Sequence, residues 1–478
     1  MLTPPEAAPS QRFRSGFTIF CGAVLLFGFG FLILTSLFFS PIHGVRSPER
    51  ALSLLSGRTM EFRNALPTAP NWERAFYRFW DPVLGSEREV EDLVDWHREL
   101  ARVAQDTTAA AAILILQAEQ GRLEEVRSQT DRWVEYSPGN LPHLSRLIQV
   151  AYLQAGSPEE PEEQLALTRE LLPSGWLRNR LEERIARKAG LPDPIAGARQ
   201  EESERGLRLL WRYRALTLLD LFTLFLCATA AFLFFTRRRL LWKAGPASLP
   251  PRWDWGTGMT VVIRGLGLGI LLGLAVAFML ELPDWADAVL TYLFWTLPLV
   301  ILARRHLFLP QGLRLRQELG LLPPAGSWKK LLVLVGVACG ADELGSWAIF
   351  LAGTFFRWPY HWAESFEENL IWAGPLTAGA TVASLAFIAP FFEELIFRGF
   401  LYGTLRKRMP WAPAAGATAF LFALAHGYGF TGFATILWSG WVLAWVYERS
   451  GSLLCPVAVH TVGNFIFAVM QVVMLRLP

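Results

Sequence analysis

Three short groups of residues, all but one of them polar, interrupt apolar stretches near the end of the chain. In chain order the groups are Glu393, Glu394 and Arg398; Phe422 and His426; and His460 and Asn464. Ionisable side chains are costly inside a membrane, so they are rare there and usually serve a function. Carboxylates, imidazoles and a carboxamide are also groups that activate water. These residues are therefore the candidates for a hydrolytic site.

Helical spacing predicts which of these side chains lie together. Residues four apart on a helix stack on one face, whereas successive residues point about 100° apart. Glu394 and Arg398 have this spacing in the favourable order, acid before base, so we expect them to neutralise one another. Glu393 points elsewhere and lacks that partner. His460 and Asn464 share one helix face.

Two mechanisms for activating water fit these residue types. A carboxylate such as Glu393, tuned by burial and by a neighbouring imidazole, can take a proton from water. His460 and Asn464 can then donate hydrogen bonds to the oxyanion, each worth about 2.7–4 kcal/mol. Alternatively, Glu393, His426 and His460 can hold a zinc ion with an open position for water. The sequence leaves both mechanisms open.

The positions of apolar residues predict an all-α, polytopic membrane bundle. About 20 apolar residues cross roughly 30 Å of hydrocarbon. Nine runs are candidates for membrane spans: residues 16–39, 213–235, 258–280, 286–303, 331–353, 373–399, 411–428, 431–447 and 453–475. The first run exceeds the core of a signal peptide, so we expect it to be an uncleaved anchor.

Composition separates a polar insert from this membrane bundle. Only 18% of the 478 residues are charged and 52% are hydrophobic, against about 25% charged in soluble proteins. Residues 44–212 nevertheless hold more than half of the charged residues. This composition excludes a soluble enzyme, a secreted disulfide scaffold and a disordered chain. The net charge of +3 is too small to indicate a nucleic-acid partner.

These patterns divide the chain into five parts. They are an N-terminal tail and anchor (1–43), a soluble helical domain (44–212), a second span with a basic linker (213–256), the first part of the bundle (257–372) and a catalytic core (373–478). Within the domain, residues 109–119 and 123–134 read as a helix pair around Gln120-Gly121-Arg122. Such pairs can stack as repeats, so this domain is either a repeat-type surface that binds a protein partner or an unspecialised helical domain.

Basic residues in the short loops predict the orientation. If the spans alternate, four clusters fall on one side, and cytoplasmic loops carry an excess of Lys and Arg. The clusters are Arg12 and Arg14; Arg237–Arg239; Arg304 and Arg305 with Lys329 and Lys330; and Arg406–Arg408. We therefore expect a multi-pass protein of a bacterial plasma membrane, with residues 44–212 outside the cytoplasm.

Other polar residues within the apolar runs have simpler interpretations. Arg264 lies near the start of its run, where a long side chain can reach the headgroups. Asp342 and Glu343 either line a cavity or pair with an arginine, or else mark a broken helix. The four cysteines all fall in or beside apolar runs, where we expect buried thiols rather than disulfides.

The three groups together resemble the motifs of the CPBP family, which contains the type II CAAX prenyl endopeptidases and the Abi proteins. Glu393-Glu394-x-x-x-Arg398, Phe422-x-x-x-His426 and His460-x-x-x-Asn464 match in order, and each lies on a predicted membrane helix. The resemblance covers residues 373–475 and does not extend to residues 1–212.

The resemblance implies an intramembrane endopeptidase, a hydrolase acting on membrane proteins or lipidated peptides at the bilayer. By that resemblance, Glu393 and His426 activate water, and His460 and Asn464 form the oxyanion site. Glu394, Arg398 and Phe422 support them structurally. No cofactor is required if glutamate activates the water, and zinc is the alternative.

Two other functions remain open from the sequence. One is a non-catalytic binding or immunity protein, in which the polar residues pack helices together and residues 44–212 bind a partner outside the cytoplasm. The other is a transporter that uses Asp342, Glu343 and Glu393 as proton-coupled sites.

Overall fold

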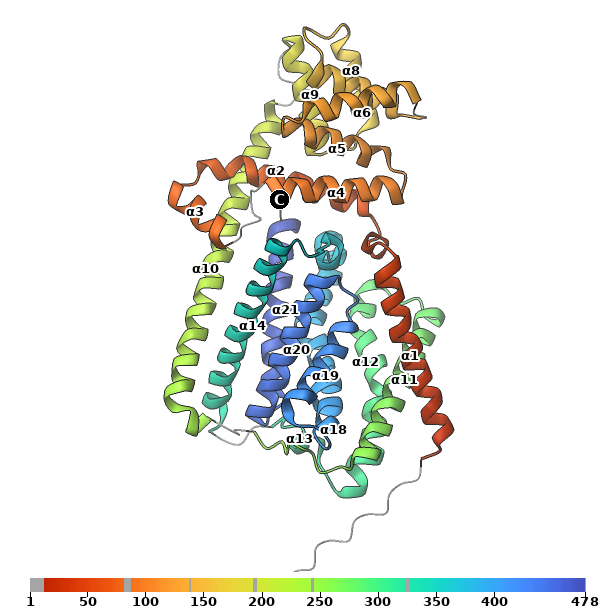
Figure 1. The fold of residues 1–478 in the computed structure, drawn as a ribbon, viewed down its shortest axis with the longest axis vertical. Coiled ribbons are helices and arrows are strands. Elements are labelled where there is room, and N and C mark those ends of the chain that lie inside the picture. Colours follow the sequence, from red (N-terminus) through yellow and green to blue (C-terminus); the bar gives the residue numbers. More distant parts are fainter. Residues whose placement is uncertain are drawn as a thin grey trace, which may run out of the picture. The chain divides into compact units, whose positions relative to one another are not determined.

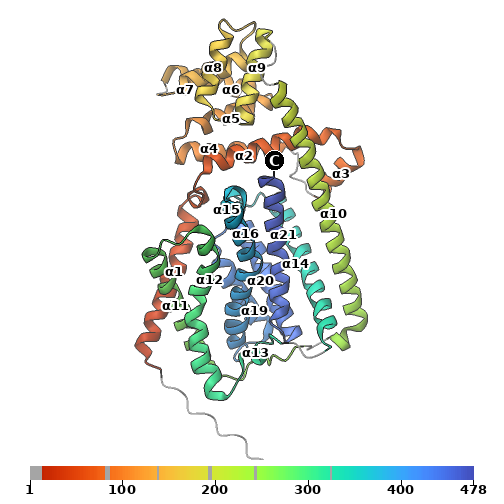
Figure 2. The same cartoon turned by 180° about the vertical axis from the view of Figure 1, so that it is seen from behind.

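A computed structural model describes residues 13–80, 87–136, 139–191, 196–241, 245–322 and 326–477, and these residues form helices joined by turns and loops (Figures 1 and 2). The chain divides into two compact units. We call Met1–Pro41 with Leu218–Val472 the membrane unit, and Ile42–Thr217 with Val473–Pro478 the insert unit. The predicted all-α polytopic fold is confirmed. Arg12, used in predicting the orientation, lies outside the described residues.

The membrane unit consists of long apolar helices with shorter ones between them. Its helices are α1 (Ser15–Phe38), the C-terminal part of α10 (Ala196–Leu241), α11 (Trp255–Met279), α12 (Asp284–Ala303), α13 (Leu315–Glu318), α14 (Trp328–Phe356), α15 (Glu368–Trp372), α16 (Pro375–Ala383), α17 (Ala389–Glu394), α18 (Gly403–Leu405), α19 (Trp411–Leu424), α20 (Phe430–Ser450) and α21 (Leu454–Gln471). Both views show α14, α20 and α21 side by side.

Eight helices in the described part of the chain are long and apolar enough to cross a membrane, one fewer than predicted. The exception is the predicted run 411–428, whose helix α19 has 14 residues and ends at Leu424. At 1.5 Å per residue such a helix spans about 21 Å. It stops there because Gly427 has a left-handed φ of 65°, a conformation that glycine adopts without strain.

Small residues let the membrane helices approach closely. A Cβ atom at Gly269 of α11 would overlap the carbonyl oxygen of Trp295 on α12. A Cβ atom at Gly345 of α14 would overlap the indole of Trp438 on α20. In a bilayer, helices associate largely through such close packing, since lipid is as apolar as leucine. Glycine is therefore required at both contacts.

The remaining polar residues of the spans are accommodated inside the membrane unit. Arg264 reaches the N-terminal end of α1, where it donates to Thr18 Oγ1 at 2.8 Å and to the Arg14 carbonyl at 2.7 Å. All four cysteines are free thiols; Cys339 is half-buried and the other three are buried. The helix α14 is continuous through Asp342 and Glu343, which excludes the broken helix, one of the alternatives that the sequence left open.

The insert unit is a stack of amphipathic helices around its own core. They are α2 (Pro48–Ala65), α3 (Asn71–Trp80), α4 (Glu87–Val103), α5 (Thr107–Glu119), α6 (Leu123–Tyr136), α7 (Leu141–Ile148), α8 (Pro161–Leu171), α9 (Trp176–Ala189) and the N-terminal part of α10. The predicted helix pair corresponds to α5 and α6, which turn at Gly121. Whether this unit binds a partner stays a prediction.

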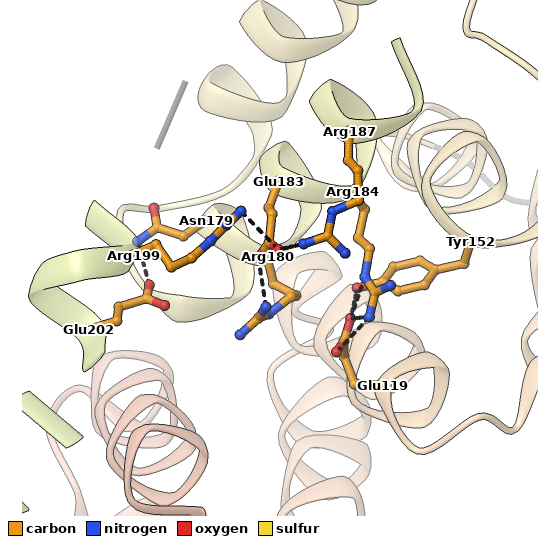
Figure 3. A network of polar contacts seen from close by, with 9 residues as sticks. All are labelled: Glu119, Tyr152, Asn179, Arg180, Glu183, Arg184, Arg187, Arg199 and Glu202. Carbon is orange, nitrogen blue, oxygen red and sulfur yellow. Dashed lines mark hydrogen bonds and ion pairs between the residues drawn. The ribbon is translucent and has the colours of Figure 1, made fainter. Parts of the chain in front are cut away.

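Arginine–carboxylate contacts join the later helices of the insert unit (Figure 3). Arg184 donates to both oxygens of Glu119 at 3.0 and 3.1 Å, and the Tyr152 hydroxyl donates to the same carboxylate at 2.8 Å. Glu183 pairs with Arg180 at 2.6 Å and with Arg199 at 3.0 Å. Since these arginines have carboxylate partners, we interpret the cluster as structural.

Candidate active site

The first candidate group lies on an irregular helix. Between Pro375 and Leu405 the chain alternates α-helix with π-helical segments at Ser384–Ile388 and Leu395–Tyr402. Glu393 and Glu394 are the last two residues of α17, the α-helical segment between them. A π-helical segment adds a residue to the turn and often occurs at functional sites. The irregular helix thus determines where both glutamates point.

The predicted pair of Glu394 and Arg398 forms and is fully buried. Arg398 Nη1 lies 2.8 Å from Glu394 Oε1, and both side chains are 0% exposed. The guanidinium also donates through Nη2 to the Gly440 carbonyl of α20 at 3.0 Å. Breaking a buried ion pair leaves an uncompensated charge and is strongly destabilising. The pair therefore ties the irregular helix to α20.

His460 of α21 lies between the two glutamates. Its Nδ1 is 3.0 Å from Glu394 Oε1, the oxygen that also accepts from Arg398. Its Nε2 is 3.8 Å from Glu393 Oε2. Glu393 is 19% exposed and His460 is 10% exposed. Spacing along the chain did not predict the contact with Glu394, because the two residues are 66 positions apart.

His426 lies in the loop after α19, two residues beyond the helix end, rather than on the predicted membrane helix. Its Nδ1 is 2.7 Å from the Phe422 carbonyl. A carbonyl oxygen can only accept, so Nδ1 carries the hydrogen and Nε2 has a free lone pair when the ring is neutral. This contact sets both the tautomer and the direction of the ring.

The buried ring of Phe422 is shared by the other side chains of the site. It contacts His426 edge-on at 4.8 Å between ring centroids and His460 at 5.8 Å. The Arg398 guanidinium stacks over it at 4.5 Å. Guanidinium over an aromatic face is favourable, especially where water is excluded. Phe422 therefore connects both histidines to the buried ion pair.

Asn464 follows His460 by one turn of α21, as predicted. Its Nδ2 donates to the Leu385 carbonyl at 2.9 Å. Leu385 lies in the first π-helical segment, where a carbonyl loses its regular helical partner. In this structure the carboxamide thus holds the helix that carries the glutamates, and its oxyanion role stays a prediction.

The three groups therefore meet in one place, through contacts between helices that are distant in sequence. Residues 375–466 match the family model of Rce1-like type II CAAX prenyl endopeptidases. This Rce1-like segment contains every residue of the three groups, from Glu393 to Asn464. No curated protein and no solved structure matches the chain. The match supports a protease, a hydrolase of peptide bonds, within a multi-pass membrane protein.

Asp342 lies outside the Rce1-like segment and contacts α20, the helix to which Arg398 is hydrogen-bonded. Ser439 of α20 donates to Asp342 Oδ2 at 3.3 Å, and the neighbouring Trp438 donates to the Ala341 carbonyl at 3.0 Å. Asp342 Oδ1 is buried and has no hydrogen-bond partner among the described residues. The hydroxyl of Ser439 thus packs α20 against α14, and Asp342 pairs with it rather than with an arginine.

Metal binding is the alternative use of the Rce1-like segment. Among the described residues, no group of three or more His, Cys, Asp or Glu side chains is close enough to hold a metal ion. Glu393, His426 and His460 are thus not arranged as a ligand set. The zinc mechanism stays a prediction, and the chemistry below uses the side chains alone.

Several contacts of the site were missed from the sequence. The carbonyls of Gly440 and Leu385 have no side-chain signature, because any residue supplies a carbonyl. The irregular helix had one local signal, Pro390, since proline cannot donate a helical hydrogen bond. Pro390 lies between the two π-helical segments.

Proposed function

We propose that the protein is an intramembrane endopeptidase that hydrolyses peptide bonds of membrane-associated proteins with water activated by Glu393 and His426. The observation that best supports this proposal is that two adjacent carboxylates, Glu393 and Glu394, are in different environments. Glu394 is fully buried and paired with Arg398, whereas Glu393 is partly exposed and faces an imidazole nitrogen. One carboxylate is structural, and the other remains accessible to water.

In this mechanism Glu393 takes a proton from water, and the water oxygen attacks the carbonyl carbon of the substrate. The lone pair on His426 Nε2 accepts a hydrogen bond from the same water, because Nδ1 is committed to the Phe422 carbonyl. Collapse of the tetrahedral intermediate breaks the C–N bond. The proton held by Glu393 then passes to the leaving amine. General acid–base catalysis of this kind contributes about 10²–10⁴-fold.

His460 and Asn464 stabilise the oxyanion of the intermediate. A protonated His460 donates from Nδ1 to Glu394 and keeps its Nε2 hydrogen for the substrate. Asn464 uses one amide hydrogen for the Leu385 carbonyl and has a second hydrogen to donate. Donors held in place before the reaction need no reorganisation when the charge develops.

Substrates of this enzyme are membrane proteins or lipidated peptides, which reach the site from the bilayer. We further propose that the insert unit lies outside the cytoplasm and binds a protein partner there. The orientation rests on basic residues in the short loops, which favour the cytoplasmic side.

The proposal is tested with purified protein in detergent and a fluorogenic library of membrane peptides. Glu393→Ala and His426→Ala should each abolish cleavage. Glu343→Gln is the matched control, because this carboxylate lies in a membrane helix but is exposed. The Glu343→Gln variant should cleave at the wild-type rate. Unchanged cleavage in both active-site variants rejects the proposal.

A further inference from the structure

The helix α3 of the insert unit has two contrasting faces. Glu73 and Tyr77, four residues apart, are 6% and 3% exposed. Trp72 and Phe79 lie two turns apart on another face, and each is 72% exposed. Large aromatic side chains exposed together are unusual on a surface that meets only water. The exposed face therefore requires an explanation.

The buried face fixes α3 to a particular level of α10 (Figure 1). Arg214 of α10 donates to both oxygens of Glu73 at 2.6 and 3.0 Å, and the Tyr77 hydroxyl donates to the same carboxylate at 2.6 Å. Tyr77 also packs edge-on against Tyr213 at 5.0 Å. These contacts hold α3 beside residues 213 and 214, where the apolar run of α10 begins.

An exposed stripe on α10 continues from this level into the apolar run. Trp211 is 66% exposed, and the Arg214 guanidinium lies over its ring at 4.5 Å. Leu218, Phe222 and Phe225 follow on the same helix face, and each is more than half exposed. A membrane-spanning helix faces its exposed apolar residues toward lipid, and tryptophan is enriched where such a helix crosses the interface.

We propose that α3 is an interfacial helix that docks on the phospholipid bilayer beside the entry point of α10, with Trp72 and Phe79 in the headgroup region. Arg78, exposed on the same helix, adds the basic group that such helices use to approach lipid phosphates. Glu73, paired with Arg214, lies on the face of α3 that contacts α10. This contact fixes the insert unit to the bilayer surface, so that any protein it binds is held near the membrane.

The test uses the full-length protein in phospholipid nanodiscs with an environment-sensitive fluorophore. The probe is attached to Trp72→Cys or Phe79→Cys, with Ser128→Cys on the exposed polar surface of α6 as the matched control. Protein without an added cysteine measures background labelling of the native thiols. We expect blue-shifted emission at positions 72 and 79 but not at 128.

Spin-labelled lipids identify what surrounds the probe. Lipid labelled near its headgroup should quench positions 72 and 79 by about twofold, and more strongly than lipid labelled at the chain end. Emission resembling that in water at both positions overturns the proposal. Blue-shifted emission that no labelled lipid quenches also overturns it, because the aromatic face is then covered by protein.

Discussion

Glu394 Oε1 lies 3.0 Å from His460 Nδ1 and accepts a hydrogen bond from Arg398 at 2.8 Å. A single carboxylate oxygen thus positions both the guanidinium and an imidazole of the site. Glu394 is therefore more than the internal partner of Arg398, because it also turns His460 Nε2 toward Glu393.

Removal of Arg398 should destabilise the protein. In Arg398→Ala the buried Glu394 keeps its charge without the guanidinium, and breaking such a pair costs about 3–5 kcal/mol. We expect a lower yield and a lower melting temperature, with less effect on any metal content. Arg406→Ala is the control, because the partner of Arg406, Glu448, is 17% exposed. Arg406→Ala should lower the melting temperature less than Arg398→Ala does. Normal expression and melting of Arg398→Ala would contradict a role for the ion pair.

Phe422→Leu should reduce turnover more than stability. Leucine keeps most of the apolar volume but loses the flat ring against which both histidines and Arg398 pack. Misplaced catalytic groups lower the rate strongly, and we expect kcat to fall by about tenfold or more. Steady-state kinetics measure this effect. Phe420→Leu, two residues earlier and 49% exposed, should keep the wild-type kcat; equal losses in both variants would refute the role of Phe422.

Asp342→Asn should leave the melting temperature unchanged or raise it. The buried carboxylate has one oxygen without a hydrogen-bond partner among the described residues, and burying an unpaired charge is costly. The amide oxygen of asparagine can still accept from Ser439. Thermal unfolding in detergent measures the effect, with Glu343→Gln as the exposed neighbour. A clear loss of stability in Asp342→Asn alone would show that the negative charge is stabilising.

The insert unit should lose stability in mild acid. Burial lowers the pKa of His97 from 6.5 to about 4, and Ser56 Oγ lies 2.9 Å from its Nε2. Below pH 6.5 His97 becomes protonated in the unfolded chain, whereas in the folded state it stays neutral down to about pH 4. The folded state therefore loses up to about 3 kcal/mol across this range.

Hydrogen exchange of α2 and α4 between pH 7 and pH 4 measures this loss, after correction for the intrinsic exchange rate. His97→Phe should flatten the pH dependence, since phenylalanine does not titrate. The same acid-induced opening in His97→Phe and wild type would exclude His97 as its cause.

Regular helical spacing predicted the parts of the site that lie within one helix. His460 followed by Asn464 depends on the 3.6-residue repeat alone. Glu394 and Arg398 keep the contact predicted from their four-residue spacing, although Arg398 lies in a π-helical segment. The contact between His460 and Glu394 depends on how α21 packs against the irregular helix, which no local pattern encodes.

The errors of prediction have physical causes as well. A hydropathy window continues through Ala425 and His426, so it extended the seventh run beyond the true helix end. The helix α19 ends before the left-handed Gly427, so His426 lies in a loop. Hydropathy equally cannot detect the π-helical segments on either side of Glu393, because they change the register without changing the composition.

Cleavage by Glu393→Gln, measured together with the metal content of the purified protein, tests the central claim most directly. The amide preserves the shape of the side chain but cannot take a proton from water. We predict an inactive variant with wild-type melting temperature and the same metal content as the wild type. Cleavage by Glu393→Gln at the wild-type rate would contradict the claim. The claim would also be contradicted if the wild-type protein contained one zinc ion per chain and the variant had lost it.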